Sequence, residues 1–333
     1  MNNETRKETQ VLPKDVRYVG ADDLTLPLFE NQYPVQPMGV SYNSYLILDE
    51  KIAVMDSVDA RAADEWLAKL AHKLDGRSPD YLVISHMEPD HSGSILRLAE
   101  KYQEMQLVGN AKTFAMLRQF FGADAPSNDR LLEVGEGGTI SLGTHTLHFM
   151  LAPMVHWPEV MVAYEETEKL LFSADAFGRF GALSRTAAAP WAPQARRYYY
   201  NIVGKYGAQV QALLKKASAL EIKTVCPLHG PVLTGGALAE ALRLYDLWSR
   251  WQSEAPEEIL LAHASIHGNT ARAAELLKQK LEAKGARVTL CDLTTTEVSY
   301  AVANAFYCGK LVLACSTYDG GLFPPMEEFL SHL

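Results

Sequence analysis

The chain has 333 residues, of which 48% are hydrophobic and 21% are charged, so it can bury a core and is not dominated by disorder. Its 31 Lys and Arg residues against 40 Asp and Glu residues give a net charge of −9, which disfavours nonspecific binding to nucleic acid. No apolar run approaches the roughly 20 residues that cross a bilayer, and the polar N-terminus is unlike a signal peptide. At roughly 100–200 residues per domain, the length predicts two domains.

Short apolar segments separated by polar turns dominate residues 1–252. Residues 45–48 and 52–55 flank a polar turn and predict a hairpin. Residues 61–74 carry apolar side chains at helical spacing, and residues 81–84 are wholly apolar, as in a strand buried on both faces. A helix is expected to start near Ser94. Further strands are predicted at 106–109, 146–151, 160–164, 170–173 and 224–226, and a helix is predicted over 196–219.

The pattern changes after a polar, proline-containing segment at residues 253–257, which we interpret as a linker. Beyond it, strands alternate with helices, and this alternation predicts βαβ units and a parallel sheet. The expected strands are 259–263, 287–292 and 310–315, and the expected helices are 270–284 and 298–305. We therefore expect a first domain at residues 1–252 and a second domain at residues 258–333.

Four cysteines are widely scattered, and none forms a CxxC pair: Cys226, Cys291, Cys308 and Cys315. In a chain of this length, such spacing predicts free thiols in a reducing compartment rather than a disulfide framework. It also disfavours a cysteine-ligated iron–sulfur or rubredoxin-type centre. We expect the protein to be cytoplasmic.

A cluster of metal-binding residue types stands just after the apolar strand at 81–84. In His86-Met87-Glu88-Pro89-Asp90-His91, four of six residues can donate lone pairs to a metal. The alternative is a polar loop with a helix cap, but the density of donors favours a metal site. Three more donors follow predicted strands in the same way: His156, Asp175 and His229. Side chains at strand ends project from a rigid base into open loops, where functional residues concentrate.

As a set in this order, these residues resemble the two-metal site of the metallo-β-lactamase superfamily. The hydrolases of that superfamily normally carry His-x-His-x-Asp-His, whereas Glu88 occupies the second position here. Imidazole-rich sites suit zinc, and added carboxylate oxygen suits iron. The motif His-x-Glu-x-Asp-His resembles the flavodiiron proteins, also called A-type flavoproteins. So do residues 172–183, which read FSADAFGRFGAL, and residues 152–158, which read APMVHWP.

The resemblance implies a metallo-β-lactamase-like αββα sandwich with two non-haem irons, followed by a flavodoxin-like domain. One iron would be held by His86, Glu88 and His156, and the other by Asp90, His91 and His229. Asp175 would bridge the pair. The remaining histidines fit no motif and are expected on the surface or on strands: His72, His145, His148, His263 and His332.

Two loops of the second domain resemble the FMN-binding loops of this family. The first joins the strand at 259–263 to the next helix and is rich in small hydroxyl residues, which can donate to a phosphate. The second, residues 316–325, resembles the loop along the isoalloxazine ring. An ordinary helix cap and an ordinary Gly/Pro turn are the alternatives. The implied FMN contacts are Ser265, Ile266, His267, Gly268, Asn269, Thr270, Thr317, Tyr318, Asp319, Gly320 and Gly321.

A flavodoxin-like domain has five parallel strands, and the sequence predicts three of them. We therefore expect the chain to end within this domain and to leave an apolar strand edge at residues 311–313. We also expect it to hold its irons but little FMN. No GxGxxG motif is present, so a nicotinamide cofactor in a Rossmann site is not expected.

The activity that the resemblance implies is reduction of dioxygen to water, of nitric oxide to nitrous oxide, or of both, with electrons passing from FMN to the diiron site. The role would be detoxification. Rubredoxin or a similar carrier would be the electron donor, and the family arrangement is a head-to-tail homodimer. A dizinc hydrolase is the main alternative, and an electron-transfer module with a vestigial metal site is a third. Glu88 and the second domain argue against the dizinc hydrolase. The complete set of ligands argues against the electron-transfer module.

Overall fold

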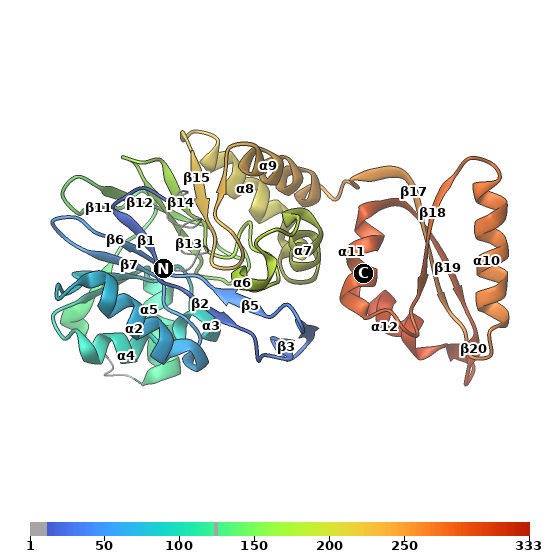
Figure 1. Ribbon diagram of the computed structural model, residues 1–333, viewed down its shortest axis with the longest axis horizontal. Coiled ribbons are helices and arrows are strands. Elements are labelled where there is room, and N and C mark those ends of the chain that lie inside the picture. The colour runs from blue at the N-terminus through green and yellow to red at the C-terminus, as the bar shows by residue number, and fades with distance from the viewer. Residues whose placement is uncertain (1–11, 123–125) are drawn as a thin grey trace. The chain divides into compact units, whose positions relative to one another are not determined.

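The computed structural model describes residues 12–122 and 126–333, and the chain forms two compact units (Figure 1). Unit 1 comprises residues 1–195 and 209–242, and unit 2 comprises residues 196–208 and 243–333. The segment 253–257, expected as a linker, is taken up from Ala255 onward by a strand of unit 2. Segments 196–208 and 243–252, both expected within the first domain, belong by their contacts to unit 2.

The described part of unit 1 contains two six-stranded sheets. The first has the order β1 (Val16–Tyr18), β6 (Tyr45–Ile47), β7 (Ala53–Met55), β8 (Tyr81–Val83), β9 (Gln106–Gly109) and β10 (Leu131–Glu133). The second has the order β11 (Thr139–Ser141), β12 (Thr146–Leu151), β13 (Met161–Glu165), β14 (Leu170–Phe172), β15 (Thr224–Cys226) and β16 (Leu233–Thr234). The predicted hairpin is confirmed, because β6 and β7 pair antiparallel.

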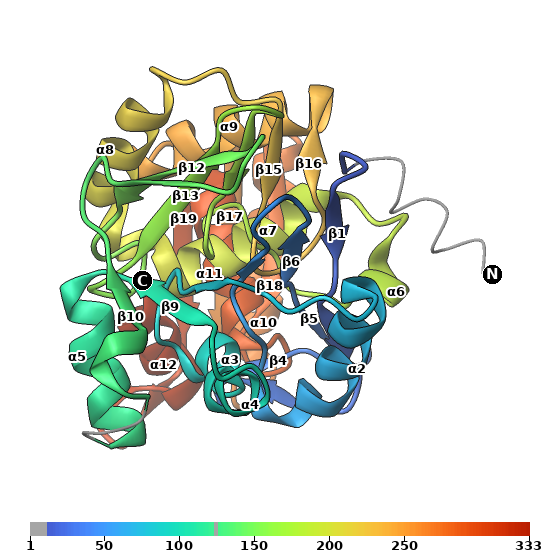
Figure 2. The same ribbon diagram turned by 90° about the vertical axis from the view of Figure 1, so that its left-hand side faces the viewer.

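Apolar side chains from both sheets form one core between them. Ile47, Met55 and Val83 enter it from the first sheet, and Phe149 and Phe172 enter it from the second. Helices cover the outer faces: α2 (Ala63–Leu74), α4 (Ile95–Lys101), α5 (Ala111–Phe121), α8 (Gly207–Ala217) and α9 (Gly235–Ser249). Figures 1 and 2 show the first three on one side of the sheets and the last two on the other. The predicted sandwich of two sheets between helical layers is confirmed.

Helix α2 shows why these layers form. Its buried residues are Ala63, Trp66, Leu70 and Leu74, which recur at three- and four-residue intervals along one face. The helix ends at Asp75, which adopts a left-handed conformation (φ 49°), a common way to terminate a helix.

A small hairpin belongs to the same unit. Strands β3 (Leu28–Phe29) and β4 (Tyr33–Pro34) pair antiparallel around a tight turn at Glu30 and Asn31. Both turn residues have left-handed backbone angles (φ 51° and 54°), and the Gln32 amide donates to the Phe29 carbonyl at 3.0 Å. These features define a type I′ β-turn. Nearby, β2 (Ala21–Asp23) pairs with β5 (Val40–Tyr42).

Unit 2 is built on a three-stranded parallel sheet in the order β18 (Arg287–Asp292), β17 (Ala255–Ala264), β19 (Cys308–Cys315). Its helices are α10 (Asn269–Glu282), α11 (Val298–Tyr307) and α12 (Pro324–His332), and β20 (Thr317–Tyr318) pairs with β21 (Gly321–Leu322). The predicted βαβ alternation is confirmed. Leu311 and Leu313 on β19 are exposed, as expected for an edge strand.

The helix predicted over 196–219 is interrupted. Helix α7 (Trp191–Tyr198) runs into a π-helical turn at Tyr199–Val203 and a 3-10 turn at Gly204–Tyr206 before α8 begins. Tyr199 and Tyr200 are buried in this interruption, and Tyr200 stacks on Phe306 with ring centroids 4.2 Å apart. Packing of these aromatic rings therefore accompanies the break in the regular helix.

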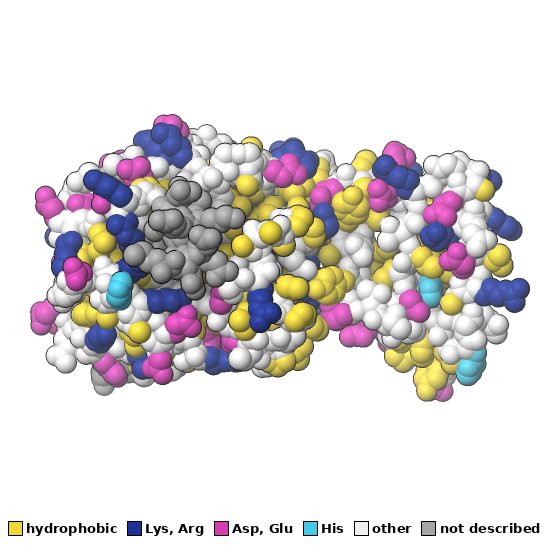
Figure 3. All heavy atoms as spheres, viewed as in Figure 1, with side chains coloured by type: hydrophobic (Ala, Val, Ile, Leu, Met, Phe, Trp, Pro, Cys, Tyr) yellow, Lys and Arg dark blue, Asp and Glu magenta, His cyan; other side chains and the backbone are white. Residues whose placement is uncertain are grey.

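Two properties of the described residues bear on the function classes considered above. Within residues 12–122 and 126–333, no helix combines the length and the apolar character that a membrane span requires. On the described part of the face in Figure 3, basic and acidic side chains are interspersed. This view therefore shows no broad basic stripe of the kind that follows a nucleic-acid backbone.

Candidate metal centre

Loops that follow four strands of unit 1 carry the seven predicted metal ligands. They follow β8 (His86, Glu88, Asp90 and His91), β12 (His156), β14 (Asp175) and β15 (His229). Strands β12, β14 and β15 run in one direction, because β13 is antiparallel to both β12 and β14 and β15 is parallel to β14. Their carboxyl ends therefore share one edge of the second sheet, and the loop after β8 joins them from the first sheet.

A short helix shapes the first loop. Helix α3 (Pro89–Ser92) begins inside the motif, with Glu88 as its N-cap and Pro89 at the first helical position, where proline is preorganised. The sequence predicted a helix only from near Ser94, where α4 follows. Because Asp90 and His91 lie on this turn, His91 Nε2 comes within 3.8 Å of Asp90 Oδ2.

The structure brings His86, Glu88 and His156 together. Glu88 Oε2 lies 3.0 Å from His156 Nε2 and 3.6 Å from His86 Nε2. His86 and Glu88 are buried, and the His156 side chain is 11% exposed. These three donor atoms define the first ligand group.

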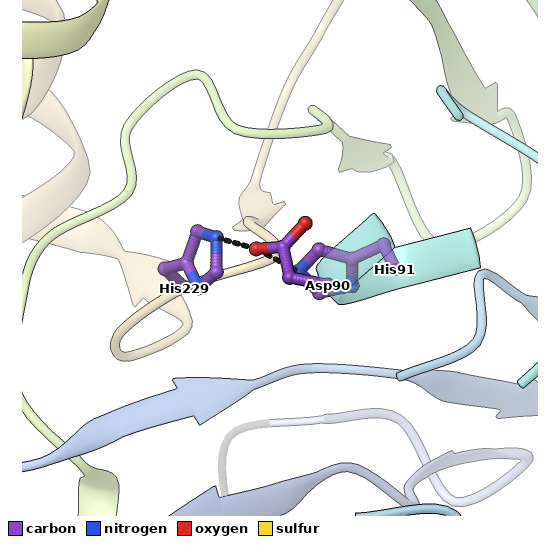
Figure 4. Close-up of side chains that lie close together, drawn as sticks. All are labelled: Asp90, His91 and His229. Carbon is purple, nitrogen blue, oxygen red and sulfur yellow. Dashed lines mark ion pairs between the residues drawn. The ribbon is translucent and has the colours of Figure 1, made fainter. Parts of the chain in front are cut away.

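Asp90, His91 and His229 form the second ligand group. Asp90 Oδ2 lies 3.1 Å from His229 Nε2, and the three residues can each turn a donor atom toward one ion. Figure 4 shows the carboxylate of Asp90 between the two imidazole rings. All three residues are buried.

Asp175 faces both groups, and each of its oxygens faces a different one. Its Oδ2 lies 3.2 Å from His86 Nε2 and 3.1 Å from His156 Nε2, in the first group. Its Oδ1 lies 3.7 Å from His229 Nε2, in the second group. Metal–ligand distances of about 2.1 Å place neighbouring ligand atoms about 3 Å apart, so these spacings suit two adjacent ions.

Several donor atoms in this cluster are buried and make no well-aligned hydrogen bond, although some of them lie in the close pairs described above. They are His86 Nε2, both carboxylate oxygens of Asp90, His91 Nε2 and Asp175 Oδ1. Buried polar atoms are nearly always hydrogen-bonded, and each exception requires a physical explanation. Two metal ions would supply the missing partners, so the residues present fit a dinuclear site.

Without a metal, the cluster shifts the pKa values of its members strongly. Burial works to raise the pKa of Glu88, but the adjacent imidazoles of His156 and His86 outweigh it and lower that pKa to about 2. Burial works to lower the pKa of His156, but hydrogen bonds to Asp175 and Glu88 raise it to about 10. Burial raises the pKa of Asp90 to about 6. Protonated imidazoles thus neutralise the negative charge of the buried carboxylates, as bound cations do in a metal site.

Backbone carbonyls orient two of the imidazoles. His91 Nδ1 lies 3.1 Å from the Ser57 carbonyl, and His229 Nδ1 lies 2.7 Å from the Ser41 carbonyl. Because a carbonyl only accepts hydrogen bonds, each Nδ1 carries the proton and each Nε2 keeps its lone pair for a metal. These carbonyls could not be recognised in the sequence, since every residue has one.

A buried hydrogen-bond network also holds the loop that follows β8. The buried carboxylate of Glu159 accepts a hydrogen bond from the Met87 amide at 2.7 Å, between two ligands of the motif. The Asn110 side-chain amide donates to the Glu159 carbonyl at 2.6 Å, and the same side chain caps α5. This chain of contacts ties the first loop to the loop that carries His156.

Glu30 is an additional residue at this site that sequence reasoning missed. Its carboxylate, that of Glu88 and the His156 imidazole can each turn a donor atom into one group within 4.8 Å. Burial of its carboxyl and the charge of Glu88 raise the pKa of Glu30 to about 8. A single glutamate in the segment Phe29-Glu30-Asn31 has no partner at a recognisable spacing, so the sequence offered no signal.

The histidines outside the motif lie elsewhere. His145 Nδ1 pairs with buried Glu165 at 3.0 Å, and His148 pairs with Glu166 at 2.8 Å on the surface. His263 is buried on β17. Neither His72, on an exposed part of α2, nor His332, near the end of α12, is in a described cluster of possible metal ligands.

The two loops predicted to contact FMN meet at Ser316 in unit 2. The Ser316 amide donates to the Ala264 carbonyl at 3.0 Å, and its hydroxyl lies 3.0 Å from the Thr270 hydroxyl. Gly268 precedes α10 with φ 85°, and nothing crowds it. Tyr318 is 53% exposed beside Gly320. Helix-start amides and an exposed aromatic ring in adjoining loops fit a phosphate and a flat ring.

Comparisons with known proteins place this chain among related proteins. The family described as ODP family beta lactamase matches residues 40–230. The rubredoxin-oxygen oxidoreductase of Megalodesulfovibrio gigas is 29% identical over 326 residues, which cover 95% of this chain and 79% of that protein. The nitric oxide reductase of Moorella thermoacetica is 27% identical over 326 residues, which cover 96% of this chain and 80% of that protein. The crystal structure of the flavodiiron protein from Giardia intestinalis superposes with a TM-score of 0.89 at 28% identity, covering 96% of this chain and 78% of that one.

Proposed function

This chain belongs to the ODP beta-lactamase family, and we propose that it is a flavodiiron reductase that converts dioxygen to water, nitric oxide to nitrous oxide, or both. The relatives described above are named for these two activities and for the flavodiiron fold. They confirm the resemblance inferred from the motif at residues 86–91 and favour a reductase over the dizinc hydrolase.

One observation carries the proposal: the two oxygens of Asp175 face different imidazoles, Oδ2 those of His86 and His156 and Oδ1 that of His229. Such a carboxylate can bridge two ions about 3.5–4 Å apart. Three carboxylates, from Glu88, Asp90 and Asp175, enter the cluster beside four imidazoles. This share of oxygen donors favours iron over zinc.

Two bound irons would supply open coordination positions and electrons. Reduction of one dioxygen to water consumes four electrons and four protons. Reduction of two nitric oxides to nitrous oxide and water consumes two electrons and two protons. The chain itself orients His91 and His229 through their Nδ1 hydrogen bonds. It limits access of water with Phe29 and Tyr42, which are both buried and whose rings lie in T-shaped contact with the His229 imidazole. The centre is thereby rigid and partly desolvated, which strengthens electrostatic interactions within it.

The proposal also includes the flavin and the partners. We expect FMN to contact the two loops that meet at Ser316, and rubredoxin or a similar carrier to deliver electrons. The prediction that this chain alone holds little FMN stays a prediction, as does a head-to-tail homodimer. A cytoplasmic location is consistent with the four cysteines, which are all free thiols.

Metal and flavin analysis of anaerobically purified protein tests the proposal. After iron-supplemented growth we expect about two irons per chain. Consumption of dioxygen or nitric oxide, measured with selective electrodes and reduced rubredoxin as donor, should depend on that iron and on added FMN. Stoichiometric zinc together with hydrolytic turnover of a thioester, lactone or phosphodiester would contradict the proposal.

A further inference from the structure

Glu30 occupies a backbone position that disfavours its residue type. It is the first central residue of the type I′ turn between β3 and β4, with φ 51°. Glycine, asparagine and aspartate dominate this position, because other side chains clash in the left-handed region. Asn31, the second central residue, follows that preference, and Glu30 does not. Strained residues of this kind concentrate at functional sites, where surrounding contacts hold them in place.

The surroundings fix this turn against the metal centre. Phe29 is 3% exposed, and its ring makes a T-shaped contact with the His229 imidazole, with centroids 5.3 Å apart. Phe29 and Tyr33, on the two strands of the hairpin, both pack against Phe180, with centroids 5.7 and 5.8 Å apart. The turn between them therefore has a defined place over the site.

From that place the Glu30 carboxylate enters the first ligand group. Its donor atom lies in one group with those of Glu88 and His156, all within 4.8 Å of one another. The residue as a whole is exposed, but its carboxyl end lies close enough to Glu88 for the charge of that carboxylate to raise its pKa, in addition to burial. Two facing carboxylates repel unless a proton or a cation lies between them.

The neighbouring His86 also indicates a cation in this group. Its Nε2 is fully buried without a hydrogen bond, although it lies 3.6 Å from Glu88 Oε2 and 3.2 Å from Asp175 Oδ2. His86 Nε2 therefore lies close to the carboxylates of Glu88 and Asp175, and the Glu30 carboxylate joins this group through Glu88 and His156.

We propose that Glu30 is an additional carboxylate ligand of the iron held by His86, Glu88 and His156. This inference rests on the proposed diiron site and extends its ligand set to a residue outside the strand-end loops. The two irons then differ in the number of carboxylates around them. Substrate would find fewer open positions at the iron with Glu30 than at the iron held by Asp90, His91 and His229.

The test compares wild-type protein with Glu30→Gln, which keeps the length and hydrogen bonding of the side chain but removes its charge. Glu100→Gln, on an exposed position of α4, is the matched control. Anaerobic protein enriched in ⁵⁷Fe is examined by Mössbauer spectroscopy, and iron release to a ferrous chelator is followed over time. We expect Glu30→Gln to change the spectrum of one iron and to accelerate its release about tenfold or more. The control should match the wild type.

Glu30→Gly separates a ligand from a structural residue. Glycine relieves the left-handed strain, so the metal-free variant should unfold at a temperature equal to or above that of the metal-free wild type. It should nevertheless release one iron faster. If both Glu30 variants keep the wild-type spectrum and release rate, the inference is wrong although the proposed function stands. If wild-type protein carries no iron pair, the proposed function itself fails.

Discussion

Asp175 is the residue on which the two metal positions depend most. It is 1% exposed, and it contributes an oxygen to each ligand group. We predict that Asp175→Ala leaves four imidazoles and two carboxylates among the candidate ligands but removes the carboxylate that would bridge the two irons. Iron content should fall below one per chain, and the reductase rate should fall at least about a hundredfold. Elemental analysis and electrode assays measure both effects.

His148 provides the control for that prediction. Its side chain is 37% exposed and pairs with Glu166 on the surface, an interaction worth about 1 kcal/mol or less. His148→Ala should keep its iron, whereas His156→Ala should lose it. Equal loss of iron from both variants would show that the ligand set is wrong.

At the scale of single elements, the ends of the buried strands were predictable and the shapes of the connections were not. Apolar runs located β8, β14 and β15, and the donors that follow them were recognisable by residue type. The short helix α3 and the turn that carries Glu30 depend on tertiary packing against residues distant in sequence. Local propensity carries no information about such contacts, and a glutamate in a left-handed turn even opposes propensity.

The loop after β8 depends on Glu159, which lies outside it. Glu159→Ala would leave the buried Met87 amide without its acceptor, at a cost of about 1–3 kcal/mol. Because Met87 lies between His86 and Glu88, we expect iron release to accelerate about tenfold. Glu159→Gln keeps an acceptor oxygen and should release iron more slowly than the alanine variant. If both variants hold iron as firmly as the wild type, the loop does not need this support.

Arg197 holds the start of α11 in unit 2. It is buried, its Nε donates to the Ser299 hydroxyl at 2.7 Å, and its guanidinium lies 4.0 Å from the Tyr300 ring centroid. It also faces Glu297, which caps the helix, at 3.5 Å. Arg197→Met should lower the free energy of unfolding by about 2–4 kcal/mol, because these polar groups would lose a buried partner.

Urea unfolding followed by tryptophan fluorescence measures that loss. Arg250→Met is the matched control, since Arg250 is exposed and pairs with exposed Asp246. It should change the free energy of unfolding by less than about 1 kcal/mol. Iron content should stay unchanged in both variants. A loss no larger for Arg197→Met than for Arg250→Met would show that the buried contacts do not stabilise α11.

At the scale of the whole molecule, the two chemistries lie on different units. All seven candidate ligands belong to unit 1, and both loops expected to contact FMN belong to unit 2. The change from many short strands to βαβ alternation predicted a boundary near residue 253, whereas the main segment of unit 2 begins at Arg243. It did not predict that residues 196–208 join unit 2, because that depends on contacts such as Tyr200 with Phe306, which are distant in sequence.

This separation predicts which amides respond to iron and which respond to flavin. Iron binding stabilises the folded site by about 4 kcal/mol when free metal exceeds its dissociation constant a thousandfold. Chelation of iron should therefore raise hydrogen exchange at residues 85–92 and 173–178 and leave β17 unchanged. FMN added in large excess to the iron-loaded protein should instead protect the loops around Gly268 and Tyr318. Mass spectrometry of exchanged peptides measures both patterns. Protection of residues 85–92 by FMN without any effect at Gly268 would place the flavin on the wrong unit and refute this arrangement.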